Sequence, residues 1–186
     1  MTRRRALWLL GATTVILLAI LALLDFELRD TGGPGIIPFE LAGSTERAQE
    51  ILSDWGDTGH DAARLSLWLD FPYLLAYGAF FSLAVLALRD AARRRGWTRL
   101  ARPGTVIAAL PPLAAACDAV ENVNLLLVLD GHADSAAPEL ATGFALAKFA
   151  FLAPAQVYLA IGLVALAVTW LREVRKDRSQ GRQAAD

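Results

Sequence analysis

The sequence has few of the side chains on which most redox, metal and cofactor chemistry depends. Its 186 residues include one cysteine and two histidines. Without a second cysteine no disulfide can form within the chain, which excludes membrane enzymes that oxidise thiols through cysteine pairs. Cys117 follows three alanines inside an apolar run. We expect it to pack as a small hydrophobic residue.

The histidines and the short motifs are equally uninformative for catalysis. His60 and His132 fall in predicted loops, so a pair of histidine ligands for haem inside a helix bundle is excluded. No ligand spacing typical of a metal site is present. The sequence also lacks a P-loop, a G-x-S-x-G elbow, an H-E-x-x-H pair and a dinucleotide-binding glycine pattern. We therefore expect no metal and no cofactor, and assign no catalytic residue.

Long apolar runs dominate the composition. Hydrophobic residues make up 55% of the chain, gathered in blocks that reach the roughly 20 residues a membrane-crossing helix needs. The sequence predicts an all-α integral membrane protein, a bundle of four transmembrane helices in a single membrane domain. The expected spans are 6–26, 65–88, 104–129 and 142–171. They are joined by loops 27–64, 89–103 and 130–141, and followed by a tail, 172–186.

A secretory signal peptide is the alternative interpretation of the first block, because Arg3, Arg4 and Arg5 precede it. The apolar run is longer than the usual core of a signal peptide, and no small-residue cleavage site follows it. We expect a retained helix.

Charge predicts the orientation. Loop 89–103 and the tail are rich in arginine, like the N-terminus, whereas residues 25–64 hold nine acids against three arginines. By the positive-inside rule both termini and loop 89–103 face the cytoplasm, and loops 27–64 and 130–141 face outward. Topology explains the arginines, so no nucleic-acid partner is implied. The composition favours a bacterial inner (plasma) membrane.

The first outer loop contains a predicted short amphipathic helix. Ser44 can cap it, an apolar face recurs at Ala48, Ile51 and Trp55, and Gly56 can end it. Such a helix either covers the mouth of the bundle as a lid or serves as a connector that hides its apolar face against the helix ends.

Several polar side chains interrupt the apolar spans. Asp118, Glu121 and Asn122 are spaced i, i+3, i+4, so they share one helix face. At ~1.5 Å per residue the charged members lie roughly 8 to 17 Å inside the outer boundary. The candidate ligand-binding or proton-handling residues are Asp118, Glu121, Asn122, Lys148, Asp70, Tyr73 and Tyr77. Asp25, at the end of the first span, is expected to be solvated.

The charges in the spans do not balance. Lys148 is one cation against the three carboxylates of Asp70, Asp118 and Glu121. Charged groups in a membrane helix are costly and are expected to face inward and find partners. Either the cluster is a structural network between helices, or protonation, water or a ligand satisfies the surplus carboxylates.

These observations predict a polar site that opens to the outer side and binds or acts on a lipid or other hydrophobic small molecule. Two alternatives remain: a proton-coupled carrier acting as a dimer, and an accessory subunit of a membrane complex. The expected partners are membrane lipid, a hydrophobic ligand, and a second copy or another membrane protein.

Overall fold

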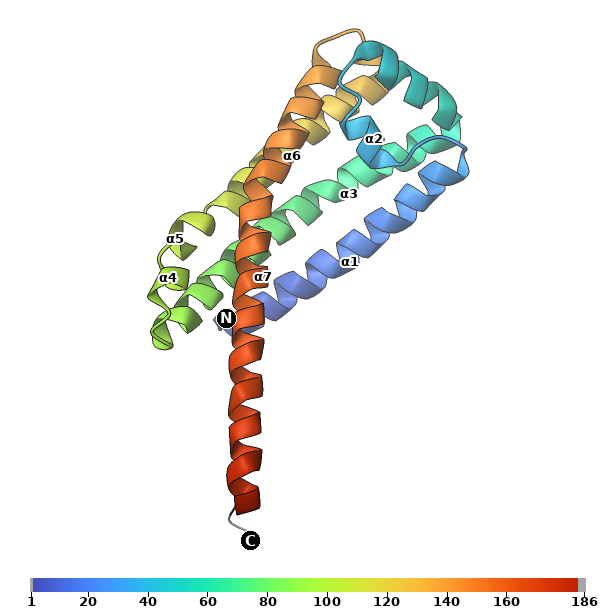
Figure 1. Cartoon of the computed structure of the whole chain (residues 1–186). Coiled ribbons are helices and arrows are strands. Elements are labelled where there is room, and N and C mark those ends of the chain that lie inside the picture. The colour runs from blue at the N-terminus through green and yellow to red at the C-terminus, as the bar shows by residue number, and fades with distance from the viewer. Residues whose placement is uncertain (1, 184–186) are drawn as a thin grey trace.

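The structure is a computed structural model that describes residues 2–183, with side chains through Val174. No strand occurs among these residues. The helices are α1 (Arg3–Asp30), α2 (Ile36–Glu40), α3 (Thr45–Arg94), α4 (Thr98–Ala101), α5 (Gly104–Ile107), α6 (Leu110–Leu127), the π-helical turn η1 (Val128–His132) and α7 (Ala137–Gln183) (Figure 1). The stretches Arg3–Asp30, Thr45–Arg94, Thr98–His132 and Ala137–Val174 are long and apolar enough to cross a membrane. The predicted all-helical fold with four such stretches is confirmed.

Capping residues set where the long helices begin. Thr2 Oγ1 accepts a hydrogen bond from the Arg5 amide at the start of α1, and Ser44 Oγ accepts one from the Arg47 amide at the start of α3. These bonds satisfy amides that have no partner within the helix. Pro111 and Pro112 occupy the first turn of α6, where a missing amide proton costs nothing. The expected span 104–129 therefore contains both α5 and α6.

Gly56 divides α3 into two segments. Its φ of 56° and ψ of −168° lie outside the helical region, in a conformation that favours glycine. The first segment, Thr45–Trp55, is called the α3 arm below. It bends away from the rest of α3 and lies close to α2 (Figure 1). Residues 57–94 form the long apolar part of α3.

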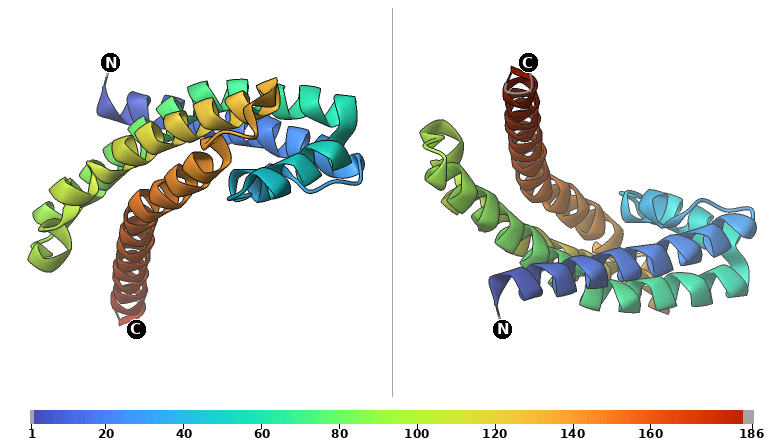
Figure 2. Two further views of the ribbon diagram at one scale, coloured as in Figure 1. Left: turned by 90° about the horizontal axis from the view of Figure 1, so that it is seen from above. Right: turned by 90° about the horizontal axis from the view of Figure 1, so that it is seen from below.

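The long helices pack in sequence order. α1 packs mainly against α3, α3 against α6, and α6 against α7 (Figures 1 and 2). Gly78 of α3 allows the close approach to α6, since a Cβ placed there would lie 3.1 Å from Ala115 Cβ. α1 and α7 are thus the two flanks of the bundle, and two of its pockets have lining residues from both of these helices.

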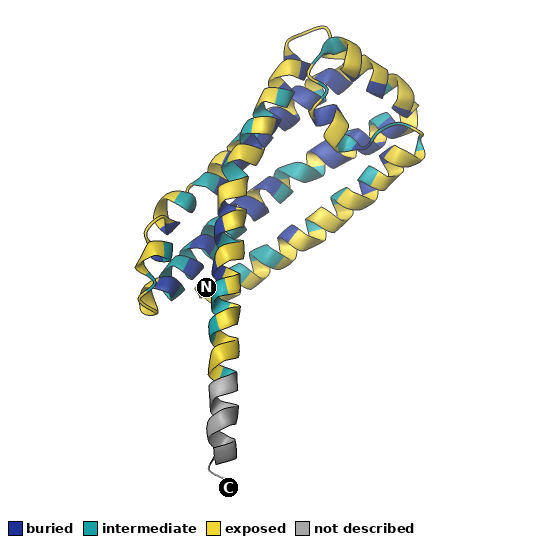
Figure 3. Cartoon of the chain, in the orientation of Figure 1, coloured by how far each residue is buried: buried dark blue, intermediate teal, exposed yellow. Residues whose placement is uncertain are grey.

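Many residues along the long helices are exposed (Figure 3), and a large share of them are big apolar residues. Trp8 is 72% exposed, Leu75 69% and Leu163 63%. Soluble monomers rarely expose contiguous apolar surface on this scale. This exposed apolar surface accompanies four helical stretches that are long and apolar enough to cross a membrane.

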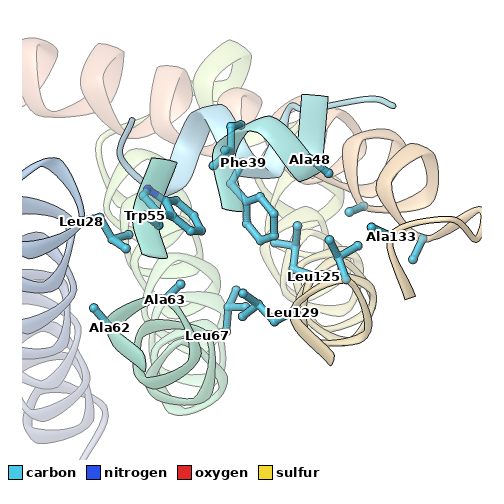
Figure 4. Close-up of a cluster of buried hydrophobic side chains, with 14 residues drawn as sticks. Leu28, Phe39, Ala48, Trp55, Ala62, Ala63, Leu67, Leu125, Leu129 and Ala133 are labelled. Carbon is cyan, nitrogen blue, oxygen red and sulfur yellow. The ribbon is translucent and has the colours of Figure 1, made fainter. Parts of the chain in front are cut away.

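The largest buried cluster lies where α2 and the α3 arm meet the ends of α1 and α6 (Figure 4). Phe39 and Trp55 pack edge to face with ring centroids 5.0 Å apart. The indole nitrogen of Trp55 donates a hydrogen bond of 2.6 Å to the Pro34 carbonyl. This cluster fixes α2 against the bundle, a position that matters because α2 ends at Glu40.

Candidate functional site

The site begins with the way α2 is held. The Asp25 carboxylate accepts a hydrogen bond of 2.6 Å from the Ile36 amide, at the first residue of α2, and a second bond from Arg29. At the other end of α2, the Thr142 hydroxyl donates to the Glu40 carbonyl at 2.9 Å and accepts from the Gly43 amide at 3.0 Å. The expectation that Asp25 is solvated is wrong, because its side chain serves as the N-terminal anchor of α2.

Lys148 of α7 is the centre of the site. Its ammonium group lies 3.3 Å from the Glu40 carboxylate, 3.0 Å from that of Asp118 and 3.0 Å from Oε1 of Glu121. Glu121 Oε2 is 2.8 Å from the same nitrogen but receives no hydrogen bond, so it is stabilised by charge alone. We call Lys148, Glu40, Asp118 and Glu121 the lysine cluster.

The lysine cluster is almost completely shielded from solvent. Glu121 is 0% exposed, Asp118 3%, and Glu40 and Lys148 8% each. With every group ionised, the three carboxylates and one ammonium carry a net charge of −2. Such an arrangement is costly to bury unless hydrogen bonds or protons offset the surplus charge.

Neighbouring side chains supply part of that compensation. The Tyr77 hydroxyl donates a hydrogen bond of 2.8 Å to Asp118. Asn122 donates one of 2.6 Å to Asp70, which therefore lies next to the lysine cluster without touching Lys148. The i, i+3, i+4 spacing explains why α6 presents Asp118, Glu121 and Asn122 to the same side.

Every candidate side chain predicted from the sequence lies in or beside this cluster. Tyr73 lies beside the cluster through its contact with Tyr77, whose ring centroid is 5.2 Å from that of Tyr73. Asn124 does not take part, because its amide donates to the Val120 carbonyl of its own helix. Sequence reasoning missed Glu40; the only signal was a single acid between Phe39 and Leu41 in an otherwise apolar stretch.

Glu40 is also the member of the cluster that lies outside the four candidate spans. Burial raises the pKa of the Glu40 carboxyl above its ordinary value of 4.5, and the Lys148 ammonium acts in the opposite direction. A glutamate in this position holds a proton to a higher pH than one in water does. The cluster can therefore exchange protons as well as ion-pair.

A pocket of about 310 Å³ adjoins the lysine cluster. Its polar wall includes Asp70, Tyr73 and Tyr77, together with parts of Asp118 and Lys148. Its apolar wall comes from α1 and α7, through residues such as Leu18, Leu21, Phe149 and Leu152. The pocket therefore lies between the two flanking helices and joins a charged wall to a hydrocarbon-like one.

The pocket does not have the composition of a metal centre. Among the side chains that the structure describes, through Val174, no group of three or more histidine, cysteine, aspartate or glutamate residues is arranged to hold a metal ion. The chemistry that the arrangement supports is proton exchange, ion pairing and hydrogen bonding beside an apolar surface.

Comparison with models of known protein families, with curated protein sequences and with solved structures found no match to this chain.

Proposed function

We propose that this protein is a four-span membrane protein that binds an amphiphilic lipid or a similar hydrophobic small molecule in the pocket beside the lysine cluster. The supporting observation is that buried charged groups border a pocket with an apolar wall. Small-molecule sites in proteins combine a mostly apolar lining with a few placed polar groups. A molecule of this kind enters from the bilayer, between α1 and α7.

The orientation of the chain is part of this proposal. Both termini lie on the cytoplasmic side of a bacterial inner membrane, as the arginines at 3–5, 89–102 and in the tail favour. The α3 arm is then an amphipathic segment at the outer surface. It packs next to α2, against the ends of α1 and α6.

A purely structural role accounts less well for the number of charged groups. One Lys148–Glu121 pair is enough to fix α7 against α6, yet Asp118 and Glu40 are added to it. Each charged residue in a membrane helix costs about 2.5–3.5 kcal/mol on insertion scales. Because of this cost, we expect carboxylates in addition to the Lys148–Glu121 pair only where a function uses them.

The accessory-subunit alternative is less favoured than the binding site. A subunit of that kind exposes polar side chains on an outer helix face for its partner. Here Asp118, Glu121 and Lys148 find their partners within one chain and are buried.

The experiment that tests the proposal is retention of lipid. Wild type, Asp70→Asn and Glu50→Gln are purified in mild detergent after incubation with membrane lipid extract, and bound lipids are identified by mass spectrometry. Glu50 is the matched control, because it is an exposed acid paired with Arg47 on the α3 arm. The proposal expects one lipid class to be retained by wild type and Glu50→Gln and lost from Asp70→Asn. Identical lipids in identical amounts on all three proteins contradict it.

Proton coupling is the second candidate, favoured by the surplus of carboxylates around Lys148. A carrier of this kind acidifies or alkalinises the lumen of proteoliposomes on addition of its substrate, and Glu121→Gln abolishes the response. Lipid retention without any pH response in proteoliposomes favours binding alone.

A further inference from the structure

A second, larger pocket lies further along the same side of the bundle. It has a volume of about 760 Å³ and is lined by α1, α3 and α7. Its large apolar lining residues include Trp8, Phe80, Phe81, Leu159 and Leu163. Its polar lining residues are Arg4 and Gln156. We call this second pocket the apolar groove.

The apolar groove follows directly on the pocket beside the lysine cluster. On α3, Tyr77 lines the pocket and Phe81, four residues later, lines the groove. On α7, Leu152 lines the pocket and Gln156, again four residues later, lines the groove. One helical turn therefore separates the two hollows on both helices.

The length of the groove suits a hydrocarbon chain. From Tyr77 to Ala91, the last groove residue on α3, the helix rises about 21 Å. One leaflet contributes about 15 Å to the hydrocarbon core of a bilayer. A full lipid chain thus fits along α3 with its polar head at the pocket.

The charge at the pocket identifies the head group. The acids that line the pocket are Asp25, Glu40, Asp70 and Asp118, and Lys148 is the one basic residue among its lining residues. Lys148 already contacts three carboxylates, so its ammonium is not free to bind an anionic head group. Asp70 accepts one hydrogen bond, from Asn122, within the described chain. The pocket is complementary to a cation that donates hydrogen bonds.

We propose that the ligand is a single-chain amphiphile with a protonated amine head, which Asp70 binds while the chain occupies the apolar groove. This inference rests on the proposed function and adds the charge of the head and the place of the chain. The opposite placement, with an anionic head at Arg4, is the competing arrangement, because Arg4 lies at the far end of the groove.

The test measures binding of radiolabelled hexadecylamine, hexadecanol and hexadecanoate to the full chain in phosphatidylcholine nanodiscs, with empty nanodiscs subtracted. The amine is expected to bind about tenfold more tightly than the alcohol or the carboxylate, the equivalent of one charge-assisted hydrogen bond. Asp70→Asn is expected to remove that preference and leave hexadecanol binding unchanged. In Arg4→Gln the amine is expected to remain the most tightly bound of the three, because Arg4 lies in the groove and not at the head.

A second pair of variants tests the groove without altering the site's charge. Ala160→Phe places a ring in the groove. Ala150 is also an exposed alanine of α7 but does not line the groove, so Ala150→Phe adds the same ring outside it. Amine binding is expected to fall about tenfold in Ala160→Phe, as steric exclusion of the chain requires, and to be retained in Ala150→Phe.

The outcomes separate the two proposals. Saturable binding of hexadecanol or hexadecanoate at least as tight as that of the amine overturns the amine head and leaves the binding function standing. Loss of binding in Arg4→Gln but not in Asp70→Asn also overturns the amine head, because that result places the head of the ligand at Arg4 and not at Asp70. No saturable binding of any of the three, together with no retained lipid from the extract, overturns both.

Discussion

The Lys148 ammonium lies 3.3 Å from the Glu40 carboxylate, although 108 positions separate the two residues in the sequence. This contact joins the first loop to the last long helix. Glu40 reaches Lys148 because Asp25 anchors the start of α2 and Thr142 anchors its end. The position of α2 in the first loop therefore determines whether Glu40 reaches Lys148.

Removing the cation is expected to be the most damaging single change to the site. Lys148→Met leaves Glu40, Asp118 and Glu121 buried beside one another without a counter-charge. Loss of one partner from a buried ion pair costs about 3–5 kcal/mol. The midpoint of thermal unfolding in detergent is expected to fall steeply, with Lys148→Arg intermediate. A Lys148→Met protein that melts with wild type contradicts the ion-pair geometry.

The pKa of Glu40 makes stability depend on pH in a defined direction. A carboxyl whose folded-state pKa is raised contributes most to stability when it is protonated, below its ordinary value of 4.5, and loses that contribution as pH rises through its folded-state pKa. In Glu40→Gln the position is neutral at every pH. The melting temperature of the variant minus that of wild type is therefore expected to increase as pH rises above 4.5. A difference that is constant with pH, or that decreases, shows that the Glu40 pKa is not raised.

The anchoring of α2 gives a test that leaves the charged groups intact. Thr142→Val removes the bond to the Glu40 carbonyl and the bond from Gly43, and each is worth about 1 kcal/mol. Thr169→Val is the control, because Thr169 bonds only to Ala165 in its own helix. Hydrogen exchange measured by mass spectrometry is expected to accelerate in the peptide that contains α2 for Thr142→Val alone. Equal exchange in the two variants argues against Thr142 as an anchor.

The sequence predicted the helices more completely than the site. Apolar block length indicates a helix, and the spacing of Asp118, Glu121 and Asn122 indicates a shared face, because both depend on local geometry. The path of the first loop does not depend on local geometry alone. Nothing in helical periodicity shows that a turn after Pro34 returns Glu40 to Lys148, so the sequence grouped Asp70, and not Glu40, with Lys148, Asp118 and Glu121. Asp25 was misjudged for the same reason, since its partner amide belongs to that loop.

Close packing of α3 on α6 is expected to depend on Gly78. Because a Cβ at Gly78 already lies 3.1 Å from Ala115, the branched side chain in Gly78→Val forces the helices apart, at a cost of about 1–3 kcal/mol. Gly143→Val carries the same penalty of a β-branched residue in a helix but meets no atom within 4 Å. Melting temperatures of the two variants measure the difference. Equal losses attribute the effect to helix propensity and not to packing.

The proposed orientation makes the two ends of the bundle distinguishable by chemical labelling. Ser135 and Arg94 are exposed, Ser135 in the turn before α7 and Arg94 at the end of α3. In a Cys117→Ser background, Ser135→Cys is expected to react with a membrane-impermeant maleimide on intact bacterial cells, because the arginine-poor loops face outward. Arg94→Cys is expected to react only after the cells are opened. The reverse pattern places the lysine cluster near the cytoplasmic surface, so the ligand then has to come from the inner leaflet.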